Sequence, residues 1–187
     1  MSLYGMLLRA YQGIIDRRLA PDYLAKKGVV FNPQTLKCYG LPYVSRGTNS
    51  KIVFGQNAQI YSRERSNPLA LDHASTFIVY DNAEIIIGDN FSCSGAIIIA
   101  KTKVTIGDHV MIGANTRIYD TDFHPTDPVL RREHPTRGAK SLPVQIGSDV
   151  FIGCHVHVLK GVTVADNSVI PAGTIVWEDF PKTKKNS

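Results

Sequence analysis

The sequence predicts an all-β protein in which short parallel strands coil around one apolar core as a solenoid. Three observations favour this fold. Aliphatic residues recur at every sixth position, small or turn-forming residues often follow them, and β-branched residues fill the stretches between. A period of six fits neither a helix nor simple strand alternation, but it fits a short strand and a turn repeated. Three such segments close a triangular coil that stacks on the next coil. The alternative, a β-sandwich, has strands of varying length and does not explain an unvarying step.

The first element expected along the chain is an amphipathic helix over residues 3–25, which we expect to end before Pro21 or at Gly28. Apolar residues at helical spacing predict it: Leu3, Leu7, Tyr11, Ile14 and Ile15. We expect this helix to cap the open end of the solenoid, whose backbone is otherwise unpaired. The alternative is association with a membrane surface through the same apolar side chains and neighbouring arginines.

The repeat then sets the expected domain organisation. We predict a helix and an irregular cap over residues 1–50, a β-helix domain over 51–181 and a basic tail over 182–187. The longest regular run is Ile146, Ile152, Val158, Val164, Ile170 and Val176. Shorter runs with the same step are Ile106, Ile112 and Ile118, then Ile87, Cys93 and Ile99, and the pair Phe54 and Ile60.

The array is interrupted between Ile118 and Ile146. These residues lie 28 positions apart, which is not a multiple of six, so a segment within about residues 120–143 must leave the solenoid as a loop. Long loops in compact domains are usually functional. This loop contains two His-Pro pairs among many charged residues, and the sequence therefore predicts the functional site there.

Composition restricts the function classes. The chain has 187 residues and a formal net charge of +5, and its three cysteines form no CxxC pair, which disfavours a disulfide framework or a zinc knuckle. No apolar run reaches the roughly 18 residues of a membrane span, and the first residues lack the pattern of a signal peptide, so we expect a cytoplasmic protein. The modest positive charge favours an anionic small molecule, a phosphorylated sugar or an acidic membrane surface. No aromatic residues interleave with the basic ones, so no nucleic acid partner is expected.

Two stretches, IGDHVMIGANTRIYDTDFHP and IGSDVFIGCHVHVLKGVTVADNSVIPAGTIV, resemble the hexapeptide-repeat acyltransferase family. The nearest members are the galactoside and maltose O-acetyltransferases and the enzymes that acetylate capsule and lipopolysaccharide sugars. The resemblance covers about residues 81–181. It implies a left-handed parallel β-helix, a homotrimer with active sites between subunits, acetyl-CoA as the co-substrate without a metal, and a sugar or oligosaccharide acceptor.

His124 is the first candidate for chemistry. It lies six residues beyond Ile118, and Pro125 biases it toward extended backbone. A neutral imidazole is suited to taking a proton from a hydroxyl near pH 7, and Asp120 or Asp122 are expected to hold its other nitrogen. The catalytic His-Pro of the family matches this pair. His134, in the second pair, is interpreted as solvated, and the other histidines, His73, His109, His155 and His157, as structural or surface residues.

The resemblance also implies the donor side of the site. The backbone N–H of Cys154 is expected to stabilise the oxyanion, while the Cys154 thiol is not expected to act as a nucleophile because related enzymes transfer the acyl group directly. The residues expected along acetyl-CoA are Phe151, Cys154, Ala172, Gly173, Trp177 and Lys182. Those expected at the acceptor are Tyr119, Asp120, Arg131 and Arg132.

The predicted function is therefore O-acetyl transfer from acetyl-CoA to a sugar hydroxyl in a ternary complex. Two alternatives are an N-acetyltransferase that acts on an amino-sugar nucleotide and a non-catalytic β-helix that only binds or serves as a scaffold. A zinc-dependent carbonic anhydrase on the same fold needs two histidines five residues apart, and no such pair occurs. The resemblance leads us to expect three departures from the family, of which the first is the absence of the N-terminal helical domain typical of the maltose enzymes. The Gly-Asn-Pro-Ala segment that commonly follows the last coil is missing, and Cys93 and Ser94 lie where galactoside enzymes carry a substrate-orienting Asn.

Overall fold

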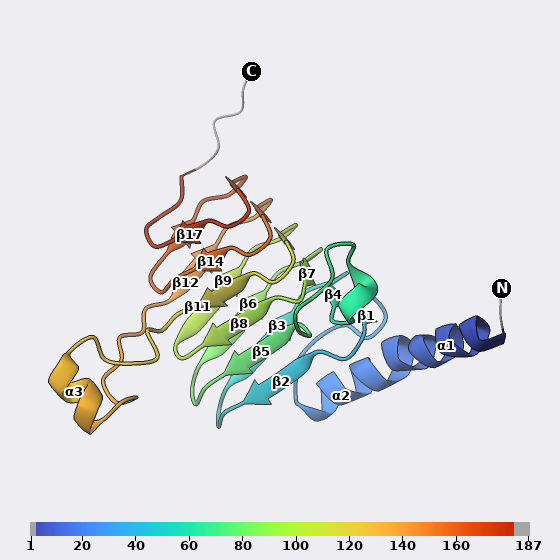
Figure 1. Cartoon of the computed structure of the whole chain (residues 1–187), viewed down its shortest axis with the longest axis horizontal. Coiled ribbons are helices and arrows are strands. Elements are labelled where there is room, and N and C mark those ends of the chain that lie inside the picture. Colours follow the sequence, from blue (N-terminus) through green and yellow to red (C-terminus); the bar gives the residue numbers. More distant parts are fainter. Residues whose placement is uncertain (1–2, 182–187) are drawn as a thin grey trace, which may run out of the picture.

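The computed structural model describes residues 3–181 and shows a triangular β-helix with a helical rod at one end (Figure 1). The rod consists of α1 (Leu3–Ile14), the π-helical turn η1 (Ile15–Leu19) and α2 (Ala20–Lys26). The π-turn lies directly before Pro21, whose missing N–H interrupts a regular helical ladder. The predicted helix is confirmed, and it continues past Pro21.

Only the second half of the rod packs on the solenoid. Ala20 and Leu24 are fully buried in the core, and Tyr23 packs against it. In α1, by contrast, the side chains of Tyr4 and Tyr11 are 74% and 62% exposed, so this helix extends past the end of the solenoid.

Three parallel sheets form the sides of the triangle, and each complete coil contributes one strand to each side. The first sheet contains β1 (Lys37–Tyr39), β4 (Gln59–Tyr61), β7 (Ser92–Ser94), β10 (Met111–Ile112), β13 (Phe151–Ile152) and β16 (Val169–Ile170). The second contains β2 (Tyr43–Arg46), β5 (Thr76–Val79), β8 (Ile97–Ala100), β11 (Arg117–Tyr119), β14 (His157–Val158) and β17 (Ile175–Val176). The third contains β3 (Lys51–Phe54), β6 (Glu84–Ile87), β9 (Lys103–Ile106), β12 (Val144–Ile146) and β15 (Thr163–Val164).

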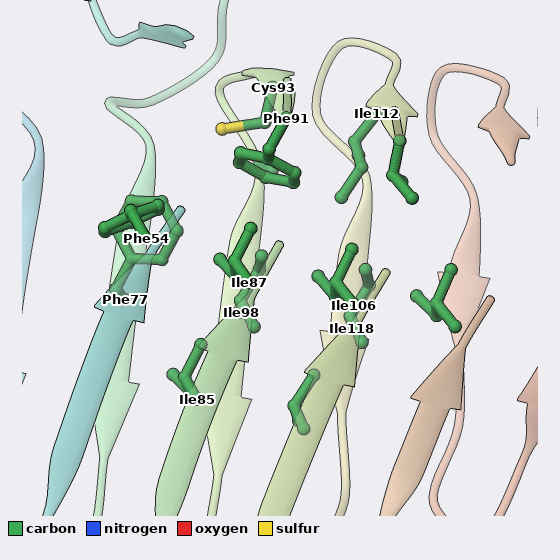
Figure 2. Packing of buried hydrophobic residues seen from close by; sticks show 14 of the residues in the cluster. Phe54, Phe77, Ile85, Ile87, Phe91, Cys93, Ile98, Ile106, Ile112 and Ile118 are labelled. Carbon is green, nitrogen blue, oxygen red and sulfur yellow. The ribbon is translucent and has the colours of Figure 1, made fainter. Parts of the chain in front are cut away.

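The aliphatic residues of the predicted repeat form the core. The six residues from Ile146 to Val176 are each at most 4% exposed, and Figure 2 shows Ile106, Ile112 and Ile118 pointing into the space between the sheets. One assignment was wrong. Ile98, not Ile99, faces the core and pairs with Ile118, because only five positions separate it from Cys93.

The corners have the backbone geometry that the turn residues predicted. Nine non-glycine residues at these corners adopt left-handed angles, with φ between 53° and 60°: Asn49, Asn57, Asn82, Asn90, His109, Asn115, Asp149, His155 and Asn167. Asparagine and aspartate tolerate this region better than most residues do. His155, interpreted from the sequence as a structural or surface residue, is one of these turn residues.

Two segments leave the solenoid at its corners. Residues 62–75 connect β4 to β5 and contain the 3₁₀ turn η2 (Glu64–Ser66). Residues 120–143 connect β11 to β12 and contain α3 (Pro128–Glu133), which confirms the predicted extruded loop. Figure 1 shows α3 well outside the three sheets. None of the helices described in residues 3–181 is both long enough and apolar enough to span a bilayer.

Candidate active site

His124 lies at the base of the extruded loop with its side chain exposed to solvent. Its Nδ1 is 2.6 Å from the backbone carbonyl oxygen of Pro135. Because a carbonyl oxygen only accepts hydrogen bonds, Nδ1 must carry the proton. In the neutral imidazole, Nε2 therefore keeps a free lone pair and can take a proton from a substrate.

The two carboxylates expected beside His124 are engaged elsewhere. Asp120 is fully buried and accepts four hydrogen bonds from the same corner of the preceding coil, at 2.6–2.7 Å. The donors are the backbone N–H groups of Lys101, Thr102 and Lys103 and the Thr102 hydroxyl. Asp122 forms a salt bridge with Lys160 at 2.8 Å. The expected orienting carboxylate is thus replaced by the Pro135 carbonyl, while Asp120 closes a coil and Asp122 ties the loop to the solenoid.

The base of the loop is ordered by contacts between its two arms. The Asp122 N–H donates to the carbonyl of Lys140 at 2.9 Å, and the Ser141 hydroxyl donates to that of Thr121 at 2.9 Å. The rings of Phe123 and Tyr119 are in contact, with centroids 5.6 Å apart. The backbone on both sides of His124 is therefore fixed.

Of the two arginines expected at the acceptor, Arg131 forms hydrogen bonds within the loop. Arg131 donates from one guanidinium nitrogen to the carbonyls of Pro125 and Thr126, at 2.9 and 3.0 Å. Arg132 is exposed on α3, and His134 ends the same helix. Both arginines are exposed, and Arg131 differs in that its guanidinium is held by the loop backbone.

Tyr119, the remaining acceptor candidate, lies on the outer face of the second sheet beside His157. Its hydroxyl is 3.3 Å from Nδ1 of His157. Burial raises the pKa of Tyr119, and burial together with the positive charge of Arg117 lowers the pKa of His157. Both shifts favour the neutral forms, and the tautomer of His157 decides which of the two groups donates.

Cys154 lies at the corner between the first and second sheets, where backbone N–H groups lack the side-chain acceptors present at another corner. At the corner between the third and first sheets, the N–H of Asp108 donates to the Ser148 hydroxyl and that of Ser148 to the Asp166 carboxylate, at 3.0 and 2.9 Å. At the corner between the first and second sheets, the equivalent positions are Ala114 and Cys154. Their side chains offer no such acceptor. Within residues 3–181 the N–H groups of Ala114 and Cys154 have no protein acceptor. These donors are available to a ligand.

A groove of about 450 Å³ opens beside this corner on the outer face of the first sheet. Its floor is made of outward residues that align strand by strand, Gln59, Ser92, Met111 and Phe151. Asn67 and Leu69 from the segment 62–75 form one wall, and Cys154 lies at the edge. Phe151, expected near the donor, is thus in this groove, whereas the other floor residues and the wall were not predicted. Outward alternation on aligned strands was the signal that could have located them.

The other donor-side candidates lie at the last coil. Ala172 and Gly173 are exposed at the same corner as Cys154, and nothing lies within 4 Å of a Cβ added at Gly173. Trp177 is 68% exposed and follows β17 in the second sheet. Lys182 lies outside the described residues.

His124 and Cys154 belong to different corners of the triangle. Residues 114 to 120 run along the second sheet from one corner to the other, which at about 3.3 Å per residue is roughly 15–20 Å. The loop that carries His124 extends away from the solenoid at the far corner (Figure 1). One chain therefore presents two half-sites. Within residues 3–181, no group of three His, Cys, Asp or Glu side chains could hold a metal ion.

Comparison with known proteins identifies the repeat. Residues 143–176 match the model of the bacterial transferase hexapeptide (six repeats), and residues 103–118 match that of the hexapeptide repeat of succinyl-transferase. The chain is 42% identical over 100 residues to the galactoside O-acetyltransferase of Escherichia coli K12, an alignment that covers 53% of this chain and 47% of that protein. The chain thus spans about half the length of this curated relative.

Two solved structures are similar. A maltose O-acetyltransferase from Clostridium difficile 630 is 30% identical with a TM-score of 0.49, over 75% of this chain and 61% of the other. The polysialic acid O-acetyltransferase OatWY is 22% identical with a TM-score of 0.50, over 82% and 74% of the two chains, and shows the shared fold. The predicted fold class, a left-handed parallel β-helix with an N-terminal helix and an extruded loop, is confirmed. Residues 103–118 and 143–176 are therefore similar to the hexapeptide repeats of the transferases that the sequence resembles.

Proposed function

We propose that this chain is an O-acetyltransferase that transfers an acetyl group from acetyl-CoA to a hydroxyl of a sugar or polysaccharide precursor in the cytoplasm. The observation that carries the proposal is the hydrogen bond from Nδ1 of His124 to the Pro135 carbonyl, because it leaves Nε2 as a free base on an exposed loop. The similarity to a galactoside O-acetyltransferase supports the same reaction class.

The proposed mechanism is direct transfer in a ternary complex. Nε2 of His124 takes the proton of the acceptor hydroxyl while its oxygen attacks the thioester carbonyl carbon. The N–H of Cys154, which has no protein acceptor in the described chain, donates to the oxyanion of the tetrahedral intermediate. The carbon–sulfur bond then breaks, and the CoA thiolate takes the proton back from His124. Asp122 positions the base through Lys160.

We assign the groove of the first sheet to the acceptor and the adjoining corner to the donor. The amide and hydroxyl groups of Gln59, Ser92 and Asn67 can hydrogen-bond a sugar, while Met111 and Phe151 supply apolar contact. Ala172, Gly173 and Trp177 are proposed to lie along the CoA arm, and Tyr119 and Arg132 to reach the acceptor from the loop of a second subunit.

We propose a homotrimer because one chain alone does not bring the two halves of the site together. Because His124 and the Cys154 N–H lie at different corners of one chain, a complete site needs the loop of one subunit beside the corner of the next. Closed cyclic symmetry makes all such sites equivalent.

The test is acetyl-CoA turnover against a panel of nucleotide-linked sugars and oligosaccharides. His124→Ala is expected to lower kcat by roughly 10²- to 10⁴-fold while leaving folding and CoA binding intact. Cys154→Ala, the companion variant, is expected to keep the rate within about threefold because its N–H remains. Full activity of the His124 variant, or a Cys154 variant as inactive as it, would contradict the mechanism.

A further inference from the structure

We infer that the acceptor is an anionic oligosaccharide held along a track on the first sheet. The track runs from the groove beside Cys154, over the rings of Tyr61 and Tyr39, to a basic groove beneath the helical rod. This inference rests on the proposed function, because it names the class of acceptor for the same site.

The basic groove lies between the rod and the first coil and has a volume of about 570 Å³. Its charged lining is Arg9 and Arg17 from the rod, Lys37 from β1, and the pair formed by Arg63 with Asp16 at 2.6 Å. Asp16 also accepts from the N–H of Gly40 at 2.7 Å, so its carboxylate is fully engaged.

The remaining cations have no ionic partner. The salt bridges within residues 3–181 are Arg63–Asp16, Lys103–Glu84 and Lys160–Asp122, so Arg9, Arg17 and Lys37 are not neutralised. Three unpaired positive charges around one concave surface favour a ligand with several negative charges. Arginine in particular matches carboxylate and phosphate groups through two parallel hydrogen bonds.

An aromatic surface joins this groove to the proposed acceptor groove. Tyr39 lines the basic groove, and Tyr61 lines the groove beside Cys154. Their rings stack on neighbouring strands with centroids 4.4 Å apart and an interplanar angle of 9°. Tyrosine offers an apolar ring face together with a polar edge, which suits a sugar ring with one apolar face and hydroxyls at its rim.

The length of the track selects an oligomer. From β1 to β13 the first sheet takes four steps between adjacent strands, through β4, β7 and β10. At about 4.8 Å per step, this is roughly 19 Å. A single sugar at the Cys154 end would not reach the cations, whereas an acidic oligosaccharide spans aromatic surface and cations together.

The experiment measures binding separately from catalysis. Oligogalacturonates of increasing length, matched neutral oligogalactosides and uridine diphosphate are titrated into the full chain by calorimetry at two salt concentrations. Lys37→Ala and Arg9→Ala are compared with Lys51→Ala, which removes an exposed lysine from the third sheet. Circular dichroism confirms that each variant is folded.

We expect the affinity for oligogalacturonate to rise with length and to fall with salt. Lys37→Ala and Arg9→Ala are expected to weaken it roughly three- to tenfold, and Lys51→Ala to leave it unchanged. Equal binding of neutral and acidic oligomers, wild-type affinity in both groove variants, or tighter binding of uridine diphosphate would overturn the inference. Binding that follows the expectation without any acetyl transfer would count against the proposed function alone.

Discussion

At the scale of single residues, the three thiols have very different surroundings. Burial raises the pKa of Cys38 and of Cys93 to about 12, whereas Cys154 is partly exposed at its corner. The thiolate is the reactive form of cysteine. A neutral aromatic disulfide reagent should therefore modify Cys154 quickly in the folded protein, and Cys38 and Cys93 only after unfolding. Cys154→Ala should abolish the fast phase. Two or three fast thiols in the wild type would mean that the core around Cys38 or Cys93 is open.

Asp120 stabilises the solenoid and does not lie at the proposed acceptor site. Expected at the acceptor, it instead accepts four hydrogen bonds inside the solenoid. Asp120→Ala leaves several backbone N–H groups without their charged acceptor and should lower the free energy of unfolding by roughly 2–4 kcal/mol. Asp81→Ala is the matched control, because Asp81 is exposed and accepts from the Thr48 N–H at another coil. This control should lower the free energy of unfolding by about 1 kcal/mol. Urea denaturation measures both, and equal effects would refute this structural role.

At the scale of elements, the coils stack so closely that glycine is required where backbones meet. A Cβ added at Gly153 would lie 2.4 Å from the backbone nitrogen of Ala172, which cannot move independently of its coil. Gly153→Ala should therefore lower the free energy of unfolding by about 1–3 kcal/mol. Gly13→Ala should raise the free energy of unfolding by up to about 1 kcal/mol. Nothing lies within 4 Å of its added Cβ, and alanine favours a helix. Thermal unfolding of the two variants compares the signs, and a neutral Gly153→Ala would contradict the tight stacking.

The repeat could be predicted because one inward residue per segment is sufficient to define it. The runs from Ile106 and from Ile146 are buried as the step of six requires. The prediction failed at Ile99, since burial alternates along this strand and a step of six from Cys93 ends on an outward position. Here Ile98 faces inward because the corner before it is one residue shorter.

The candidate site was predictable where chemistry resides in a side chain and less so where it resides in the backbone. His124 stands out from its position and its proline. The Pro135 carbonyl, its hydrogen-bond partner, could not be predicted from the sequence. It lies 11 positions further along and approaches His124 only when the loop folds. The grooves of the first sheet were missed for a related reason. Gln59, Ser92 and Met111 are far apart in the sequence and become neighbours only when the strand register is known.

At the scale of the whole molecule, a site divided between two corners predicts that catalysis requires contact between subunits. His124→Ala removes the proposed base, and Ala172→Trp fills the exposed corner proposed for the donor, so each variant alone should be inactive. Random mixed trimers made by co-expression would contain sites in which an intact loop faces an intact corner, and these should recover about one quarter of the wild-type activity. Separately purified proteins mixed without subunit exchange are the control and should stay inactive. Mass measurement in solution checks the trimer, and mixed trimers without activity would place both halves of the site within one chain.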